Sequence, residues 1–587
     1  MCGICGFNDD DKAAIKAMVS TLRHRGPDQE GTYTDSGVSL GHRRLSIIDL
    51  SEKGRQPMSN EDGDVWITYN GEIYNYKSIR RELESKGHKF SSCTDTETIV
   101  HAYEEYGPDC VTRLNGMFAF AIWDNKNKTF MLARDRLGIK PLYYYNCGPL
   151  FAFGSEIKSL LAHPKVETAL SLSGLAEFID YAYTVSGATL FDGIREVPPG
   201  TVIIYNGDLT SRRYWEVKID VSDREEDYYI RMLRGMLGKA VERRLVSDVP
   251  LGASLSGGID SSSVVAFMSK SVEAPIKTFT IGFNDPSDEL AEARVVADYC
   301  KTDHHEIMVE FEDISRNLPK IVWHSEAPFG RPSMFSGYFL SRGINNNKVI
   351  VDLSGSGGDE IFAGYNRYDV FVNDKDASGD KKLSRMRSGY FPDKSRFFDA
   401  GSEQNQSDNI FSPYLKGVPP EEHLNAALKF ELETELQGIQ LFRDDRMSMA
   451  HAHEVRVPLL DHTLVEFAMT IPSRLKWHGE NKKYIFQRTM KGLLPDSIVN
   501  RVKKPFGMPL ARYFSEDLLD VADSILARPR SFKAAGIKNC GIQKLIQQLK
   551  AGDLSDNPHR QLLFFTTLEI LYRIYFENEK PVLSNFL

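Results

Sequence analysis

The sequence predicts a chain of mixed α/β and α+β class, in which a strand-rich part, a parallel sheet and a helical part follow one another. Up to about residue 205, short strand-and-turn patterns surround two helical stretches. From about residue 228, strand and helix patterns alternate, which is typical of a doubly wound parallel sheet. From Glu421 onward the pattern is mostly helical. A chain of 587 residues is too long for one hydrophobic core, so we expect several domains.

The first part begins with elements that alternate between strand and helix signals. Residues 65–69 predict a strand that ends at a turn formed by Asn70 and Gly71. Residues 76–86 and 95–106 predict helices, since apolar side chains recur there at helical spacing. A turn and a last hairpin end this part near residue 208.

A charged stretch, 208–227, predicts a linker between two domains, which we expect to span 1–207 and 228–587. Strands of the second domain are expected at 250–255, 277–283, 305–309 and 348–353. Helical stretches separate them, as a parallel sheet requires. The stretch of about 373–412 is polar and rich in Gly, Ser, Asp and Lys, which predicts a surface insertion.

Composition excludes several classes of protein. Lys and Arg number 72 and Asp and Glu 81, so the formal net charge is −9, which disfavours a general nucleic-acid binder. The longest apolar run that we find, 117–123, is far shorter than the ~20 residues of a membrane helix, so we expect no membrane insertion. The N-terminus lacks the pattern of a signal peptide, and the seven cysteines form no disulfide framework. We therefore expect a cytoplasmic protein.

Cys2 and Cys5 form a CxxC motif, which is typical of redox or zinc sites. No second CxxC or histidine pair follows nearby at ligand spacing, and no strand precedes the motif as in thioredoxin-like proteins. Removal of Met1 would instead leave Cys2 with a free α-amino group, whose pKa is ~7.7–8.0. That amine can act as the base for the thiol of the same residue, so the sequence favours an N-terminal nucleophile.

Four short runs extend this interpretation: MCGICG at 1–6, HRGPD at 24–28, GHRRLSI at 41–47 and YNGEIYN at 69–75. In this order they resemble the class II glutamine amidotransferase domains, and the runs at 94–97 and 133–143 fit the same family. The resemblance covers nearly all of 1–205. It implies the four-layer αββα fold of N-terminal-nucleophile proteins.

The resemblance also implies a role for each matching residue. Cys2 would attack the carboxamide of glutamine, forming a glutamyl thioester and releasing ammonia. Asn70 and Gly71 would donate hydrogen bonds to the oxyanion, although an Asn-Gly pair taken alone favours a type I′ hairpin turn. Arg44 would bind the α-carboxylate of glutamine, and acceptors for its α-ammonium would come from Glu72 and Asp95. The implied glutamine-binding set is Arg44, Asn70, Glu72 and Asp95.

The second candidate site is a glycine-rich loop, LSGGIDSS at 255–262, which follows a predicted strand and opens a predicted helix. It lacks the GK[ST] of a P-loop and resembles the pyrophosphate loop of ATP pyrophosphatases, which activate a carboxylate as an acyl-adenylate. A second loop, LSGSGGDE at 353–360, also follows a strand. The resemblance implies Mg²⁺ ligands at Asp260 and Asp359. The implied ATP-binding set is Leu255, Ser256, Gly257, Gly258, Asp260, Ser261, Ser262, Ile281, Ser354 and Gly355.

The order of the two domains, with the runs at 444–451 and 454–462, is similar to the glutamine-hydrolysing asparagine synthetase family. Lys483 matches the lysine of that family which stabilises charge during adenylation and amide formation, although a Lys-Lys pair alone is typical of a solvated face. The resemblance implies amidation of L-aspartate, with glutamine and ATP as the other substrates. Family members are often dimers, so it also implies a homodimer.

Three positions depart from the family pattern. Ser356 and Ala327 stand where acids are usual, and Arg331 replaces another acid. With Arg342, these positions predict an acceptor site less negative than usual, which favours as an alternative a carboxylate without an α-ammonium, such as a uronic acid on a nucleotide or lipid carrier. A lesser alternative is a glutaminase or regulatory protein with an inactive synthetase domain. An amidotransferase for either acceptor needs an apolar path for ammonia between its domains, for which Met117, Phe118 and Ala119 are candidates, although a strand core explains the three residues equally well.

Overall fold

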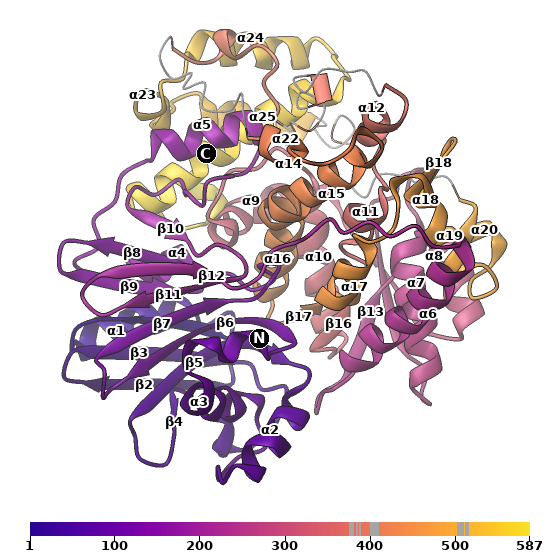
Figure 1. Cartoon of the computed structure of the whole chain (residues 1–587). Helices are drawn as coiled ribbons and strands as arrows, with labels where there is room; N and C mark the ends of the chain where they lie inside the picture. The colour runs from indigo at the N-terminus through magenta and orange to yellow at the C-terminus, as the bar shows by residue number, and fades with distance from the viewer. Residues whose placement is uncertain are drawn as a thin grey trace.

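The computed structural model describes residues 1–374, 381–382, 386, 389–399, 410–501, 510 and 516–586. About half of the predicted polar insertion at about 373–412 lies outside the described residues. Within the described part, Tyr390, Phe391, Phe397 and Phe398 are buried in a hydrophobic core cluster, so the prediction of a surface insertion is wrong for this part. In Figure 1 the strand-rich first domain lies at the lower left, the parallel sheet at the lower right and the C-terminal helices at the top.

Two six-stranded antiparallel sheets form the first domain. In spatial order the first consists of β10 (Ile194–Glu196), β8 (Tyr143–Cys147), β9 (Leu150–Gly154), β1 (Gly3–Phe7), β3 (Val38–Arg44) and β2 (Gln29–Asp35). The second consists of β12 (Leu209–Arg213), β11 (Thr201–Tyr205), β7 (Thr129–Arg134), β6 (Gly116–Asp124), β5 (Val65–Ile73) and β4 (Met58–Ser59). The sheet therefore continues to residue 213, whereas the sequence placed the end of the domain at 207.

The two sheets pack face to face through apolar side chains, among them Ile4, Ala121 and Phe153. Helix α1 (Lys12–Thr21) covers the outer face of the first sheet, and α2 (Tyr76–Ser85) and α3 (Asp95–Tyr106) cover that of the second. This layering of helix, sheet, sheet and helix confirms the predicted αββα fold.

The prediction of a turn at Asn70-Gly71 is wrong. Strand β5 runs through both residues to Ile73, because Asn70, Gly71 and Glu72 pair with Ala119, Phe118 and Met117 of β6. A side chain at position 71 would meet the Met117 carbonyl oxygen at 2.2 Å, so only glycine lets the two strands approach this closely. The Asn-Gly pair is therefore a feature of a strand interior rather than of a hairpin.

The second domain contains a five-stranded parallel sheet in the order β15 (Asp303–Met308), β14 (Lys277–Gly282), β13 (Leu251–Ser254), β16 (Val351–Leu353), β17 (Glu454–Arg456). The predicted doubly wound sheet is thereby confirmed. Its flanking helices include α6 (Glu226–Arg243), α7 (Ile259–Ser271), α8 (Leu290–Cys300) and α10 (Ser333–Asn346). The strand order reverses at β13, so the loops after β13 and β16 leave the same edge side by side, where parallel sheets bind ligands.

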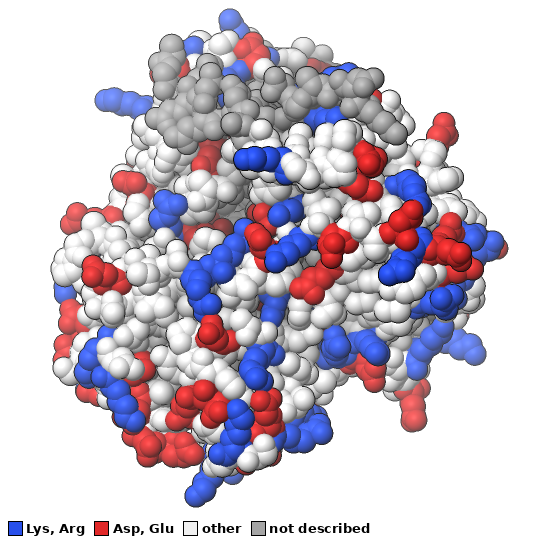
Figure 2. Space-filling view, in the orientation of Figure 1, with Lys and Arg blue, Asp and Glu red and all other residues white. Residues whose placement is uncertain are grey.

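Helices dominate the remainder of the chain. Helices α16 (Phe442–Met449) and α9 (Phe311–Ser325) of the second domain contact the first domain, and α25 (Asp556–Phe576) packs on α9. Within the described ranges, none of the helices combines the length and the apolar character that crossing a membrane requires. Lys and Arg side chains are interspersed with Asp and Glu over the face drawn in Figure 2.

A buried network of charged side chains joins the two domains. Arg25 lies 2.8 Å from both Glu156 of its own domain and Asp445 of α16. Arg446 lies 2.9 Å from Glu326, whose carboxylate also accepts the N–H groups of residues 157 and 158 at the start of α4 (Ile157–Leu161). With Lys158, three cations face three anions, so the charges balance across the interface.

Apolar contacts accompany these charges. Met117 belongs to the same buried cluster as Leu255 and Leu460 of the second domain, in agreement with its predicted place at the interface. Phe118 instead packs toward α2 and α3, and Ala119 lies between the two sheets. Because successive side chains of a strand point to opposite faces, the three residues could not share one path, and that part of the prediction is wrong.

Candidate active site

Cys2 and Asn70 meet across the two sheets of the first domain. The Cys2 N–H donates to the Asn70 Oδ1 atom at 2.9 Å, which fixes the orientation of the amide. The Asn70 Nδ2 group is buried and has no hydrogen-bond partner among the described residues. A buried N–H group without a partner is costly, so its presence beside a thiol is the arrangement expected of an oxyanion donor.

Gly71 supplies a second donor at the same place. The N–H groups of Tyr69 and Ile73 point to the free edge of β5, where they donate to Gln56 Oε1 at 2.8 Å and to Asp95 Oδ2 at 2.9 Å. Since N–H directions alternate along a strand, the N–H of Gly71 points to the same edge. The expected oxyanion pair, Asn70 and Gly71, therefore follows from strand geometry and not from a turn.

The Cys2 thiol is nearly enclosed, and burial raises the pKa of the Cys2 thiol above its ordinary value. A buried neutral thiol needs a base before it can attack a carboxamide. The Cys2 nitrogen is here in a peptide bond with Met1, whose own ammonium lies 3.1 Å from Glu454 of the second domain. Arg25 Nε donates to the Cys2 carbonyl oxygen at 3.0 Å, so the interdomain network reaches the nucleophile directly.

Glu72 lies within β5 and Asp95 lies beside that strand, and both are implied in glutamine recognition. Asp95, at the start of α3, accepts from the Tyr69 hydroxyl at 2.7 Å. Burial raises the pKa of the Asp95 carboxyl to about 6. Burial and the charge of Asp95 raise the pKa of Glu72 well above its ordinary value. Two interacting buried carboxyls form a site that attracts a cation such as an α-ammonium.

Arg44 is buried, but its terminal nitrogens are already engaged. They donate to Gln29 Oε1 and the Ser51 carbonyl, each at 2.9 Å, and to the carbonyls of Ile48 and Asp49. Arg44 thus holds the loop after β3 in shape. Its direct contact with a glutamine carboxylate stays a prediction.

The Asn70 Nδ2 group, which has no hydrogen-bond partner among the described residues, gives a testable prediction. Replacing Asn70 with Asp keeps the Oδ1 acceptor for the Cys2 N–H and removes the Nδ2 donor. We expect kcat for glutamine hydrolysis to fall by about 10²–10³-fold, the usual cost of losing one oxyanion donor, with little change in KM. Steady-state kinetics with glutamine alone measures this, and an unchanged kcat would contradict the assignment.

The raised pKa values predict how glutamine affinity depends on pH. As pH falls below about 6, Asp95 binds a proton and its attraction for the α-ammonium of glutamine is lost. We expect kcat/KM for glutamine to fall up to about tenfold per pH unit there, mainly through KM. In the Asp95→Asn variant this acid limb should weaken while the KM for ATP keeps its pH profile. An acid limb of the same steepness in the variant would refute the assignment.

The two loops of the second domain touch one another at the edge of the parallel sheet. Gly257, with φ of +70°, turns the chain after β13, and Gly258 is the N-cap residue of α7. A side chain at Gly355 would meet the Ser261 nitrogen at 2.4 Å, and one at Gly358 would meet Asp260 Oδ1 at 2.3 Å. The glycines therefore let the loops pack together, with the N-terminus of a 13-residue helix at their centre.

The remaining members of the ATP-binding set line this junction at different depths. Ser256 is half-buried and its N–H donates to Ser261 Oγ at 3.1 Å, whereas Ser262 is fully buried and its hydroxyl has no partner within the described part of the chain. The Ser354 N–H donates to the Arg456 carbonyl at 2.8 Å. Leu255 and Ile281 are buried beside the loops.

Lys483 joins the two loops through its ammonium group, which lies 2.5 Å from Asp260 and 2.6 Å from Asp359. Burial alone would lower the pKa of Lys483, but the two carboxylates raise it above its ordinary value. Lys483 is 5 % exposed, so the alternative of a solvated face does not hold for it. Two carboxylates converging on one cation are also a donor set that suits Mg²⁺, so the residues fit that ion.

The four residues expected to set acceptor specificity do not form one group. Arg331 pairs with Glu435, which also pairs with Arg367, and a small cavity of about 70 Å³ between the domains is lined by Arg331 and Ala327. Ser356 lies apart from that lining and donates to Asp444 Oδ2 at 2.6 Å. Such a volume is well below that of ordinary ligand sites, so the cavity alone does not hold an acceptor.

Arg342 was expected to join these residues. It pairs instead with Asp313 of α9 at 3.3 Å and lies over the Phe339 ring. In the described ranges it shares no hydrogen bond or ion pair with Arg331 or Ser356. The helix α10 carries the Arg342 side chain toward α9, so the structure does not bring Arg342 together with Arg331 or Ser356, and its place in the acceptor site stays a prediction.

Arg456 is a site residue that sequence reasoning missed. Its side chain lies 3.6 Å from Glu72 of the glutamine site and 2.7 Å from Glu454, while its carbonyl accepts the N–H of Ser354 in the second ATP loop. It is fully buried. The run at 454–462 gave the signal, but no pattern in one chain says that Arg456 touches both sites.

Together, these features define the class of protein. A cysteine lies beside a buried amide group that has no hydrogen-bond partner in the described part of the chain, in an αββα domain. This domain is joined to a parallel-sheet domain with a pyrophosphate-type loop, as in a two-domain glutamine amidotransferase. Family models agree: one described as a glutamine amidotransferase domain matches residues 1–215, and one described as asparagine synthase matches residues 232–573. The chain belongs to the asparagine synthase family and is a ligase that uses ATP.

Curated relatives cover most of the chain. "Asparagine synthetase [glutamine-hydrolyzing] 3" of Bacillus subtilis is 34% identical over 534 residues, with 86% of this chain and 87% of the relative covered. "Asparagine synthetase [glutamine-hydrolyzing] 1" of the same organism is 32% identical over 573 residues, with 90% of each chain covered. "Amidase chyE" of Penicillium rubens is 29% identical, covering 87% of this chain and 89% of the relative.

Proposed function

We propose that this enzyme converts L-aspartate to L-asparagine, with glutamine as the nitrogen donor and ATP cleaved to AMP and pyrophosphate. The observation that supports the proposal is the juxtaposition of the residues around Cys2 with those around Lys483, with Arg456 between them. The names of the two B. subtilis relatives support aspartate as the acceptor.

In the first half-reaction, removal of Met1 frees the Cys2 amine, which takes the proton of the thiol. The Cys2 sulfur then attacks the glutamine carboxamide. Asn70 Nδ2–H and Gly71 N–H stabilise the oxyanion, whereas Glu72 and Asp95 orient the α-ammonium. The Cys2 ammonium returns that proton to the leaving nitrogen, ammonia departs, and water hydrolyses the thioester to glutamate and the free thiol. The buried interface beside Met117 excludes bulk water, which would otherwise protonate the ammonia.

In the second half-reaction, the acceptor carboxylate attacks the α-phosphorus of ATP and pyrophosphate leaves. Backbone N–H groups of the loop around Gly258 bind the pyrophosphate, and Lys483 offsets the charge that develops on it. Mg²⁺ held by Asp260 and Asp359 would neutralise further phosphate charge when bound. Lys483 Nζ then supports attack of ammonia on the acyl-adenylate, giving the amide and AMP.

Pyrophosphate release tests the proposed acceptor. The full-length enzyme is incubated with ATP, Mg²⁺ and glutamine, with and without L-aspartate, and pyrophosphate, AMP and asparagine are quantified. We expect aspartate-dependent pyrophosphate in equal amounts with asparagine. Glutamine hydrolysis without aspartate-dependent pyrophosphate would redirect the search to other carboxylates. Glutamine hydrolysis with no ATP cleavage for any carboxylate would support an inactive synthetase domain.

A second candidate acceptor is a carboxylate without an α-ammonium, such as a uronic acid on a nucleotide or lipid carrier. Arg331 and Ser356 favour it, since both replace usual acids of the family and so remove partners for an α-ammonium. The pairing of Arg331 with Glu435 works against it, because that carboxylate offsets the added charge. The relative from P. rubens is 29% identical to this chain and is named an amidase, so relatives at this level of identity do not all carry the name asparagine synthetase.

Restoring acids at these positions should separate the two acceptors. With Arg331→Asp and Ser356→Glu combined, we expect kcat/KM for aspartate to rise about tenfold, because carboxylates again face the α-ammonium. Arg342→Asp makes the same charge change as Arg331→Asp alone, at a residue that pairs with Asp313 instead of Glu435, and serves as the control for that substitution. An unchanged acceptor preference in the double variant would refute the role of the two residues.

A further inference from the structure

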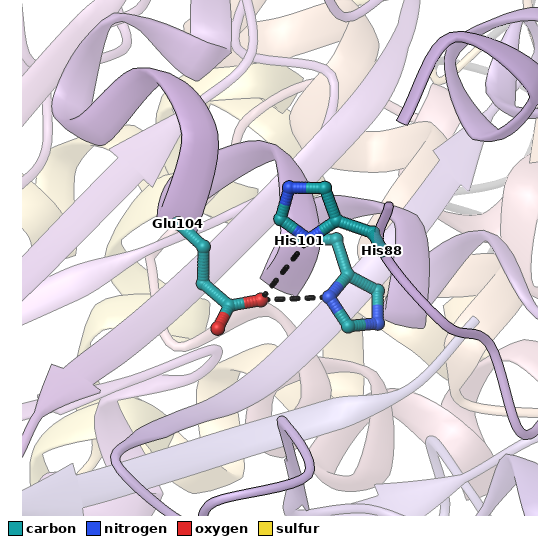
Figure 3. Close-up of side chains that lie close together, drawn as sticks. All are labelled: His88, His101 and Glu104. Atoms are coloured by element: carbon teal, nitrogen blue, oxygen red, sulfur yellow. Dashed lines mark hydrogen bonds and ion pairs between the residues drawn. The ribbon is translucent and has the colours of Figure 1, made fainter. Parts of the chain in front are cut away.

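Three potential metal ligands converge on the outer side of the first domain, outside the site described above. His101 and Glu104 lie one turn apart on α3, and His88 lies in the loop that leads from α2 to that helix (Figure 3). The Glu104 Oε2 atom is 2.7 Å from His101 Nδ1 and 3.7 Å from His88 Nδ1. The three ligand atoms lie within 4.8 Å of one another.

The outer nitrogens of both imidazoles face further carboxylates. His88 Nε2 lies 3.4 Å from Glu105, and His101 Nε2 lies 4.0 Å from Glu97. Metal-bound histidines typically direct one nitrogen to the ion and the other to a carboxylate, which fixes the ring and its tautomer. In both rings the Nδ1 atom faces Glu104 Oε2, and the Nε2 atom faces a second carboxylate on the other side of the ring.

We propose that His88 Nδ1, His101 Nδ1 and Glu104 Oε2 bind a divalent transition metal, best matched by zinc. Imidazole nitrogens with one carboxylate suit zinc rather than magnesium. Tetrahedral ligands at bond lengths of about 2.0–2.1 Å lie about 3.3 Å from one another, and the two nitrogen–oxygen distances here flank that value. His101 is buried, whereas Glu104 is partly exposed, so an ion can enter and water can complete the shell.

An ion at this position would connect two segments of the first domain. It would tie the 86–94 loop to α3, whose first residue is Asp95. Further along that loop, the Cys93 N–H donates to Asp49 Oδ2 at 2.9 Å, and the Asp49 carbonyl accepts from Arg44. The bound metal would therefore stiffen one wall of the first domain, and its loss would lower the melting temperature. Metal binding itself does not depend on the proposed acceptor or reaction.

Metal titration of the full-length, tag-free chain tests this inference. The protein is first dialysed against a chelator, then titrated with zinc alone by calorimetry and with cobalt alone by absorption spectroscopy. We expect one high-affinity ion per chain, a tetrahedral cobalt spectrum without thiolate charge transfer, and a zinc-dependent rise in melting temperature. His88→Ala should weaken binding at least tenfold and abolish the rise, whereas His478→Ala, which removes an exposed imidazole elsewhere, should change neither.

Glu104→Gln provides a second variant, since it keeps the hydrogen bond from Asn60 Nδ2 to the Oε1 position and removes the charged ligand. It should weaken zinc at least tenfold while its circular dichroism matches that of the wild type. Equal affinity in the wild type and His88→Ala would overturn the proposal, as would absence of binding by the wild type. Thiolate-to-cobalt charge transfer would place the ion at a cysteine and overturn it as well.

Discussion

Replacing Cys2 with alanine should abolish glutamine-dependent amide formation while ammonium salts still support it. The thiol is the sole attacking atom of the first half-reaction, so we expect loss of at least about 10³-fold in glutamine hydrolysis. Among the described residues, the Cys2 sulfur forms a hydrogen bond with the Leu45 carbonyl oxygen and none with a residue of the second site. Ammonia-dependent pyrophosphate release in the variant should therefore stay within about twofold of the wild-type rate. Product formation with each nitrogen source measures both effects.

Cys5 offers the matched control for this experiment. It is the other cysteine of the CxxC motif, and it is fully buried in β1. Cys5→Ala should retain glutamine hydrolysis, because its thiol faces the core rather than Asn70. Equal loss of activity in both variants would indicate that the CxxC acts as a pair and would contradict the N-terminal nucleophile.

Replacing Lys483 with methionine should abolish amide formation from both nitrogen sources and leave glutamine hydrolysis intact. Methionine replaces the apolar part of the lysine side chain but lacks the ammonium group that lies between Asp260 and Asp359. We expect acceptor-dependent pyrophosphate release to fall by about 10²–10⁴-fold, because phosphate charge is no longer offset and two carboxylates face each other. Pyrophosphate and glutamate are measured in the same reaction.

Lys482 supplies the control, since it is adjacent in sequence and contacts Asn366 rather than the two aspartates. Lys482→Met should change pyrophosphate release by less than about threefold. Loss of glutamine hydrolysis in Lys483→Met would show that the variant damages the whole fold, and normal pyrophosphate release would refute the role given to Lys483.

Local patterns predicted the fold class well. The alternation of strands and helices after residue 228 corresponds to β13 through β16, and the helix at 95–106 has the predicted bounds. The pattern failed at Asn70-Gly71 because turn propensity is local, whereas the pairing of β5 with β6 over nine residue pairs is not. The same tertiary pairing places both residues in a strand beside Cys2, where we propose that they act as oxyanion donors.

The sequence predicted only some of the contacts that segments far apart in the chain make at the site. Lys483 is separated by 223 positions from Asp260, yet motif matching placed both at the ATP site. Arg342 lies apart from Arg331 and Ser356 because its side chain faces α9, and residue type does not encode such packing. Arg456 was missed for the same reason, since it acts through Glu72 of one domain and Ser354 of the other.

We propose that one enzyme both activates a carboxylate as an acyl-adenylate and amidates it with ammonia from glutamine. The most direct measurement uses an acceptor whose carboxylate carries ¹⁸O, with glutamine and ATP, followed by mass spectrometry of the products. Attack of the carboxylate on the α-phosphorus predicts one ¹⁸O atom in AMP for each amide formed. Unlabelled AMP, or formation of ADP and phosphate in its place, would contradict the account.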